Sequence, residues 1–375
     1  MERKNAWAAY AGDDGRVEAF AKAYCDFINN GKTERECVAY GEKLAKAHGF
    51  EDLNAVVRSG RKLEAGARVY ANWMGKSFML FVLGEKPLEE GMNILGAHID
   101  SPRIDVKQNP LYEDTDLAYL DTHYYGGIKK YQWVAIPLAL HGVIVRKTGE
   151  KVIINIGEDE NDPVFCISDL LVHLAQEQMT KNAKEVVEGE ALNLIVGGRP
   201  LEGEEKDAVK ANVLKLLADK YGVEEEDFLS AELEIVPAGK ARDMGFDRSM
   251  ILAYGHDDRV CAYPSMMAVL DYEGTPEYTL CCIVTDKEEI GSVGATGMAS
   301  HYLENTVAEL YACTADYCEL AVRRCLRNSR MLSSDVSAGY DPNFASAFEK
   351  KNSAFLGRGI CFNKFTGSRG KSGSN

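Results

Sequence analysis

Amphipathic patterning at the start of the chain predicts two helices within residues 13–49. Apolar side chains of the first helix recur at helical spacing and therefore share one face: Phe20, Ala21, Tyr24, Phe27 and Ile28. The second helix is predicted to begin after Thr33, because Glu36 three residues later completes the pattern of a capping box. Gly49 is predicted to end it, since glycine commonly follows the last turn of a helix.

Short, continuously apolar runs predict strands that are buried on both faces. Two of them, residues 77–83 and 92–97, come before a stretch of different texture, and a third, residues 278–284, comes after it. Strands before and after such a stretch indicate one α/β domain that is interrupted by a second domain. We therefore expect the main domain in two parts, at residues 1–104 and 240–375.

The intervening block, residues 105–239, is expected to be the inserted domain. Residues 141–146 and 152–156 predict paired strands around a turn at Thr148 and Gly149. Helical patterns follow. One covers residues 169–181, and an acidic, lysine-rich one covers residues 202–226 and is expected to be exposed.

Composition narrows the class of protein. Charged residues make up 27% and hydrophobic residues 46% of the chain, which is typical of a soluble globular protein. No apolar run suits a transmembrane helix, and the first residues do not resemble a secretory signal, so no membrane partner is expected. A net charge of −15 would repel polyanions and disfavours nucleic-acid binding. The ten cysteines are scattered without Cys-x-x-Cys spacing, which predicts free thiols in a reducing cytoplasm.

The first candidate for chemistry is His98 with Asp100, at the end of the run 92–97. Open α/β sheets place their ligands at this end of a strand. Residues two apart on an extended chain point the same way, so Asp100 could accept a hydrogen bond from the His98 imidazole and orient it toward a metal. Taken alone, such a pair is more often a buried histidine whose polar atoms are simply satisfied.

Asp257 and Asp258 form the second candidate. They follow the apolar run 250–253, which is interpreted as another buried strand. Adjacent acids at such a position are costly unless a positive group compensates them, and Arg259 could offset one. A carboxylate that uses both oxygens can bridge two metal ions about 3.5–4 Å apart. An exposed Asp-Asp turn is the alternative, and it explains the pair equally well by itself.

Glu288 and Glu289 form the third and most informative candidate, because the predicted strand 278–284 leads them into a glycine-rich bend. One glutamate could bind a metal while its neighbour deprotonates the attacking water and then protonates the leaving amine. The glycines that follow lack the Gly-Lys-Ser/Thr ending of a phosphate loop, so a nucleotide site is disfavoured.

Asp335 is the fourth candidate, and alone it would be explained as a turn or helix-capping aspartate. The four candidates nevertheless share one pattern, since each follows the end of a predicted strand. Carboxylates with a minority of imidazole favour Zn²⁺, Mn²⁺ or Co²⁺ in a co-catalytic pair and disfavour a cysteine-rich structural zinc site. The residues therefore predict a hydrolytic dinuclear centre.

Five segments together make the chain resemble the aspartyl aminopeptidase / aminopeptidase I family of zinc metallopeptidases. They are residues 96–102, 122–128, 257–259, 286–292 and 333–335. The resemblance implies a mixed central sheet flanked by helices, with the inserted block as a smaller, β-rich dimerisation domain. It also implies homo-oligomers in which dimers assemble into a dodecamer.

The resemblance further implies a role for each candidate residue. Two divalent metal ions, zinc by preference, would be bound by His98, Asp257, Glu289 and Asp335. Asp257 would bridge both ions and be followed by a cis peptide, and Asp100 would orient His98. Glu288 would be the general base acting on a metal-activated water. The substrate would be a peptide with a free N-terminus, from which the N-terminal residue is removed.

One departure from the family pattern concerns its last metal ligand, a histidine near the C-terminus. The final histidine here is His301, which lies in a helical context, and the chain ends in the glycine- and serine-rich residues 365–375. We therefore expect that the C-terminal part of the catalytic domain is missing and that one metal lacks a ligand. This polypeptide alone is expected to be poorly stable and nearly inactive.

Two other functions stay open. Carboxypeptidase or amide deacylase chemistry could use the same metal pair, and a carboxypeptidase would need a cationic clamp such as Arg103, Lys129 or Arg259. A non-catalytic shell or cargo protein could also retain this fold. The intact Glu288 and His98 argue against that reading.

Overall fold

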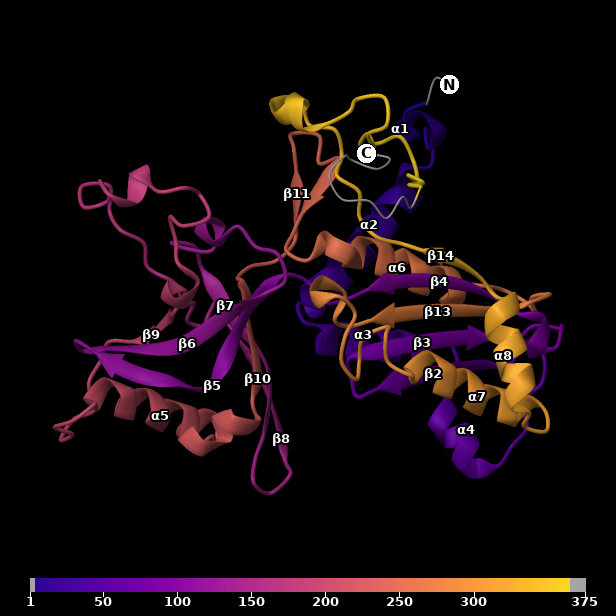
Figure 1. Ribbon diagram of the computed structural model, residues 1–375, viewed down its shortest axis with the longest axis horizontal. Helices are drawn as coiled ribbons and strands as arrows, with labels where there is room; N and C mark the ends of the chain where they lie inside the picture. Colours follow the sequence, from indigo (N-terminus) through magenta and orange to yellow (C-terminus); the bar gives the residue numbers. More distant parts are fainter. Residues whose placement is uncertain (1–3, 365–375) are drawn as a thin grey trace.

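The protein is described by a computed structural model covering residues 4–364, which shows two lobes that are each built around a β-sheet (Figure 1). The predicted loop-like ending at residues 365–375 lies outside the described residues. The main sheet has six strands in the order β1-β2-β3-β13-β4-β14. They are β1 (Glu51–Asp52), β2 (Arg68–Trp73), β3 (Ser77–Val82), β13 (Thr279–Thr285), β4 (Met92–His98) and β14 (Arg330–Ser333).

Strand direction makes the main sheet a mixed one. β4 is parallel to both β13 and β14, whereas β3 is antiparallel to β2 and β13. The three continuously apolar runs that predicted buried strands lie in β3, β4 and β13, so those predictions are confirmed. The α/β class with a mixed central sheet is confirmed as well.

Helices cover both faces of the main sheet, and the alternation of side chains along its strands explains why. Phe78 and Leu80 of β3 pack on one face, and Met79 and Phe81 pack on the other. The first face is covered by α2 (Asp14–Asn30), α3 (Glu34–Ala47) and α6 (His256–Leu270). The second is covered by α4 (Leu53–Ser59), α7 (Tyr302–Thr314) and α8 (Glu319–Asn328), while the short α1 (Ala6–Ala9) lies near the start of the chain (Figure 1).

The predicted start of α3 is confirmed. The Thr33 side chain accepts a hydrogen bond from the backbone N–H of Glu36, and the Glu36 side chain accepts one from the backbone of Thr33. This reciprocal arrangement satisfies two donors that a helix start leaves without partners. The helix ends at Ala47, two residues before Gly49, which takes a left-handed conformation at φ 76°.

The second lobe holds an antiparallel sheet in the order β8-β7-β10-β5-β6-β9. Its strands are β5 (Arg103–Asp114), β6 (Leu117–Tyr125), β7 (Leu138–Val145), β8 (Lys151–Ile156), β9 (Leu194–Gly197) and β10 (Glu232–Pro237). The predicted hairpin is confirmed as β7 paired with β8. The sheet is formed wholly by residues that lie between β4 and β13 in the sequence, while the division into domains at 1–104, 105–239 and 240–375 stays a prediction.

Two helix predictions in this lobe need correction. Residues 169–181 form turns and a short 3-10 helix, Gln178–Thr180, instead of an α-helix. A helix needs a surface on which to bury its apolar face, but Leu171, Val172 and Leu174 are exposed here. The predicted helix over residues 202–226 is shorter, as α5 (Ala208–Tyr221), and it packs partly against the second sheet.

The apolar run 250–253 was also misinterpreted. It does not form a buried strand of the main sheet, because β12 (Met250–Leu252) pairs only with β11 (Arg242–Met244) in a two-stranded ribbon. The Leu252 side chain is exposed. A short apolar run does not reveal which sheet it joins, and this one lies in the connection between the lobes (Figure 1). Within residues 4–364, no helix has the length and apolar character to span a bilayer.

Candidate metal centre

The centre of the site is His98, the last residue of β4, whose side chain is almost fully buried. Its Nδ1 lies 3.0 Å from the backbone oxygen of Asp100 and 3.3 Å from Oδ1 of the same residue. Its Nε2 faces three other carboxylates. The distances are 3.3 Å to Asp257 Oδ1, 3.8 Å to Glu288 Oε2 and 3.8 Å to Asp335 Oδ1. The imidazole is therefore oriented on one side and presented to an acidic cluster on the other.

The main sheet explains why these residues meet. β4 lies between β13 and β14 and runs parallel to both, so three strands end at the same edge. His98 is in register with Thr285, the last residue of β13, and the chain then turns into the 3-10 helix Glu288–Ile290. Asp335 follows the end of β14 in the same way. Parallel strands thus bring side chains that are distant in sequence to one carboxyl edge.

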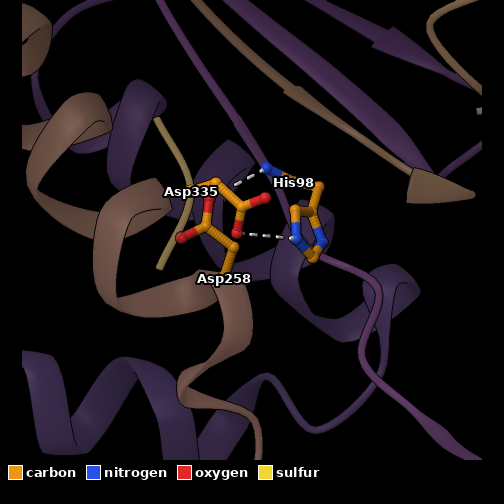
Figure 2. Close-up of side chains that lie close together, drawn as sticks. All are labelled: His98, Asp258 and Asp335. Atoms are coloured by element: carbon orange, nitrogen blue, oxygen red, sulfur yellow. Dashed lines mark hydrogen bonds and ion pairs between the residues drawn. The ribbon is translucent and has the colours of Figure 1, made fainter. Parts of the chain in front are cut away.

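Asp257 and Asp258 reach the site from another direction, at the start of α6. The peptide bond between them is cis, as the family resemblance implied. The Ser101 hydroxyl donates to the backbone oxygen of Asp257 at 2.5 Å. The backbone N–H of His98 donates to Asp258 Oδ2 at 3.4 Å, and Figure 2 shows Asp258 beside His98 and Asp335.

Two groups of side chains could each hold a metal ion, and they share His98. One consists of His98, Asp257 and Glu289, and the other of His98, Asp258 and Asp335. In each group the ligand atoms lie within 4.8 Å of one another. Carboxylate oxygens with one imidazole are suitable donors for Zn²⁺ or Mn²⁺.

The shifted pKa values of the carboxylates in the cluster indicate that negative charge exceeds positive charge there. Burial raises the pKa of Asp258 to about 6. Burial, together with repulsion from Asp257, raises the pKa of Glu289 to about 7. Although burial alone would lower the pKa of His98, hydrogen bonds to Asp100, Asp257 and Asp335 raise it. The cluster therefore favours any added positive charge.

Two buried oxygen atoms without hydrogen-bond partners indicate which positively charged species the cluster binds. Within the described residues, Asp258 Oδ1 and Glu289 Oε1 are buried and accept no hydrogen bond. Buried polar atoms are nearly always paired, so each such atom needs an explanation. One orphan belongs to each of the two groups. The donor set and the orphaned oxygens fit a pair of divalent cations.

Asp100 holds the glutamate-bearing loop as well as the histidine. Its Oδ1 accepts the backbone N–H of Glu288 at 3.2 Å, and its Oδ2 accepts that of Glu289 at 3.2 Å. Oδ2 also accepts a hydrogen bond from the Tyr125 hydroxyl at 2.7 Å. Asp100 is fully buried. It is thus a fixed point between β4, β6 and the loop that follows β13.

Comparison with known proteins decides the family. The family model described as aminopeptidase I zinc metalloprotease (M18) matches residues 27–375. The chain belongs to the M18 family. A probable M18 family aminopeptidase 1 from Clostridium acetobutylicum is 57% identical over 378 residues, which cover 100% of this chain and 81% of the relative. The resemblance seen in the sequence is therefore confirmed.

Solved structures support the same fold. The crystal structure of aminopeptidase I from Clostridium acetobutylicum aligns with a TM-score of 0.89 at 55% identity, over 100% of this chain and 81% of that one. A dodecamer structure of mApe1 from S. cerevesiae aligns with a TM-score of 0.70 at 21% identity, over 91% of this chain and 76% of that one, and it shows the fold alone. This M18 protein is a metal-dependent aminopeptidase, a hydrolase whose family uses zinc.

The structure gathers the sequence-predicted residues of this M18 chain in one place. The imidazole of His98 is within 4 Å of Asp257, Glu288 and Asp335, and Glu289 joins Asp257 in one ligand group. The interpretation that Asp257 follows a buried strand is wrong, since it lies in the first turn of α6, which begins at His256.

Two further residues lie at the M18 site: Asp258, which was considered beside Asp257 but not chosen as a ligand, and Tyr125, which was given no role. Asp258 belongs to one of the two ligand groups, and Tyr125 contacts Asp100 from the second sheet. The segment 122–128 did contribute to the resemblance, so a signal for Tyr125 was present. Nothing in the sequence linked that segment to Asp100.

Proposed function

We propose that peptide hydrolysis takes place at the cluster around His98 and removes the N-terminal residue of peptides with a free α-amine. His98, Asp257, Glu289 and Asp335 would hold two divalent cations, and Asp258 lies beside Asp335 in one of the two ligand groups. Bound cations would polarise the scissile carbonyl and lower the pKa of the attacking water. The observation that carries this proposal is the pair of ligand groups that share His98 and each contain an orphaned buried oxygen.

Glu288 is proposed as the general base. Its side chain is 46% exposed and lies at the rim of the cluster, whereas its backbone is fixed by Asp100. A carboxylate in this position can take a proton from water and pass it to the leaving amine. Burial raises its pKa above the ordinary value, which favours proton transfer near neutrality.

The charges around the site favour an aminopeptidase over a carboxypeptidase. The cluster is rich in carboxylates and would attract the α-ammonium group of a peptide. Arg103 and Arg259, two candidates for a carboxylate clamp, are buried. Arg103 is occupied by an ion pair with Glu34, and Arg259 donates to the backbone oxygen of Ile99. Neither is free to bind the C-terminus of a substrate.

Assembly and location are part of the proposal. We propose a homo-oligomer built from dimers, supported by the dodecamer reported for mApe1, a protein of the same fold. A cytoplasmic location is supported by the cysteines, which are all free thiols. Buried free thiols are typical of proteins kept in a reducing compartment.

Glu288→Gln tests the proposed site. We expect kcat on an unblocked peptide to fall by about 10²–10⁴-fold, the usual contribution of a general base, while zinc affinity changes little. Glu304→Gln is the matched control, because Glu304 is exposed on α7 and belongs to neither ligand group. N-acetylated peptides should be rejected by the unmodified protein. Retained activity in Glu288→Gln, or equal turnover of acetylated peptides, would contradict the proposal.

A further inference from the structure

Tyr125, the last residue of β6, extends from the second sheet to the metal centre. The Tyr125 side chain is buried, and its hydroxyl donates to Asp100 Oδ2 at 2.7 Å. That is the shortest hydrogen bond that the side chain of Asp100 makes. Asp100 lies just beyond β4 of the main sheet, so this contact joins the two lobes.

Two cations flank the ring of Tyr125. The Arg103 guanidinium lies 3.9 Å from the ring centroid, and the Lys287 ammonium lies 5.2 Å from it. Arg103 is the cross-strand neighbour of Tyr125, on β5, and it is fixed by ion pairs with Glu34 and Asp105. Cations over an aromatic face bind it and draw electron density from it, which strengthens the hydroxyl as a donor. Lys287 is also the residue before Glu288, so the ring contacts the catalytic loop directly.

Asp100 links Tyr125 to three parts of the site. It faces the His98 Nδ1 and accepts the backbone N–H groups of Glu288 and Glu289. Without the tyrosine hydroxyl, Oδ2 would keep only the 3.2 Å bond from Glu289. A carboxylate with one fewer donor in a buried place is free to rotate, and its partners lose their fixed position.

We infer that Tyr125 is a positioning residue, which fixes Asp100 and through it the His98 ring and the Glu288–Glu289 loop, so that the catalytic geometry depends on how the second sheet is seated. The expected effect of Tyr125 on the reaction rate rests on the proposed function. The expected effect on the Glu288–Glu289 loop follows from the hydrogen bonds alone. Tyr125 acts through Asp100, which its hydroxyl contacts, and is therefore a positioning residue and not a catalytic one.

Tyr125→Phe tests the inference, because it removes the hydroxyl and leaves the ring between Arg103 and Lys287. We expect kcat to fall about tenfold or more, with KM within about twofold, and zinc affinity to fall by a similar factor, as is usual when a residue behind a metal ligand is lost. Tyr124→Phe is the matched control, since Tyr124 is the preceding residue and its side chain is exposed. It should leave all three quantities unchanged.

Amide hydrogen exchange gives a readout that needs no turnover. In Tyr125→Phe, exchange over residues 286–290 should be about fivefold faster, the effect of losing one hydrogen bond of ordinary strength. The melting temperature shows whether the variant is folded. Unchanged exchange in a folded Tyr125→Phe protein would overturn the inference, whatever the activity.

A double-mutant cycle separates action through Asp100 from a general packing defect. If Tyr125 acts through Asp100, Tyr125→Phe should lower kcat little further in an Asp100→Asn background. Fully multiplicative effects would overturn the inference. If Glu288→Gln leaves the protein active, the proposed function fails, while the exchange experiment still decides whether Tyr125 holds the loop.

Discussion

Two clusters of carboxylates among the described residues differ in what neutralises them. The first surrounds His98 at the edge of the main sheet. The second is formed by Glu34, Glu232 and Glu234, whose ligand atoms also lie close enough together to suggest a metal site. In the second cluster, however, Lys76 Nζ is 2.7 Å from Glu34, and Arg103 Nε is 3.2 Å from Glu234.

This difference shows how to interpret an acidic cluster. Lys76 and Arg103 are themselves buried and form ion pairs with the glutamates, so the chain supplies its own cations there. The cluster around His98 has no lysine or arginine in ion-pair contact with Asp257, Glu289 or Asp335 within the described residues. Buried charge must be compensated in either case. The first cluster therefore fits metal ions, and the second joins the lobes.

Removing the cation from the second cluster should have the largest effect on stability. Lys76→Met would leave Glu34, Glu232 and Asp286 without their shared partner. Loss of one member of a buried charge network typically destabilises by about 3–5 kcal/mol. Denaturant unfolding monitored by circular dichroism should show a loss of this size. The exposed pair Lys46–Glu42 provides the control, and Lys46→Met should change stability little.

A small effect of Lys76→Met on stability would show that the second cluster does not depend on the cations of the chain, and it would contradict the distinction between the two clusters. Recovery of stability when Zn²⁺ is added to the variant, and not to the unmodified protein, would support that distinction. The glutamates would then have become a metal site only because Lys76 had gone.

Zinc should stabilise the protein through the first cluster alone. At a free concentration of about 100 times its Kd, a ligand that binds only the folded state stabilises it by about 2.7 kcal/mol. His98→Gln should abolish the zinc-dependent rise in melting temperature, because His98 belongs to both ligand groups there. Glu232→Gln should retain it. A zinc effect lost in Glu232→Gln and kept in His98→Gln would reverse the two assignments.

The sequence predicted the strands of the main sheet better than the surroundings of the site. β3, β4 and β13 are buried on both faces, and a continuous apolar run is a direct signature of that burial. The local order of residues thus placed His98, Glu288 and Glu289 at a strand edge. Asp257 was assigned to the same site for a wrong reason, because an apolar run does not reveal which sheet its strand joins.

Sequence patterns gave no role to Tyr125, and they named Asp258 only beside Asp257, without showing that both contact His98. The role of Tyr125 depends on how the second sheet sits against β4, which no periodicity encodes. Asp258 is distinguished from Asp257 only by the backbone geometry at the start of α6. The wrong helix over residues 169–181 has a related cause, because helical spacing of apolar residues does not show that a surface exists to bury them.

A smaller effect, dependent on pH, should come from a third cluster between α3 and the second sheet. His141 is buried on β7, and its ring nitrogens lie 2.9 Å from Glu36 and 3.3 Å from Glu158. Lys32 also pairs with Glu158, at 2.6 Å. Burial would lower the pKa of His141, but its contacts with Glu158 and Glu36 outweigh it and raise the pKa above 6.5.

The sign of the effect follows from that shift. A group whose folded pKa is raised contributes stability that is fully present below its unfolded pKa, here 6.5, and is lost as pH rises through the folded value. Unfolding free energy measured from pH 6 upward should therefore decline more steeply in the unmodified protein than in His141→Gln. The unmodified protein should show this decline even without zinc, because His141 belongs to neither ligand group around His98. Parallel curves would show that the imidazole is not held as a cation, and that this cluster relies on Lys32 alone for its positive charge.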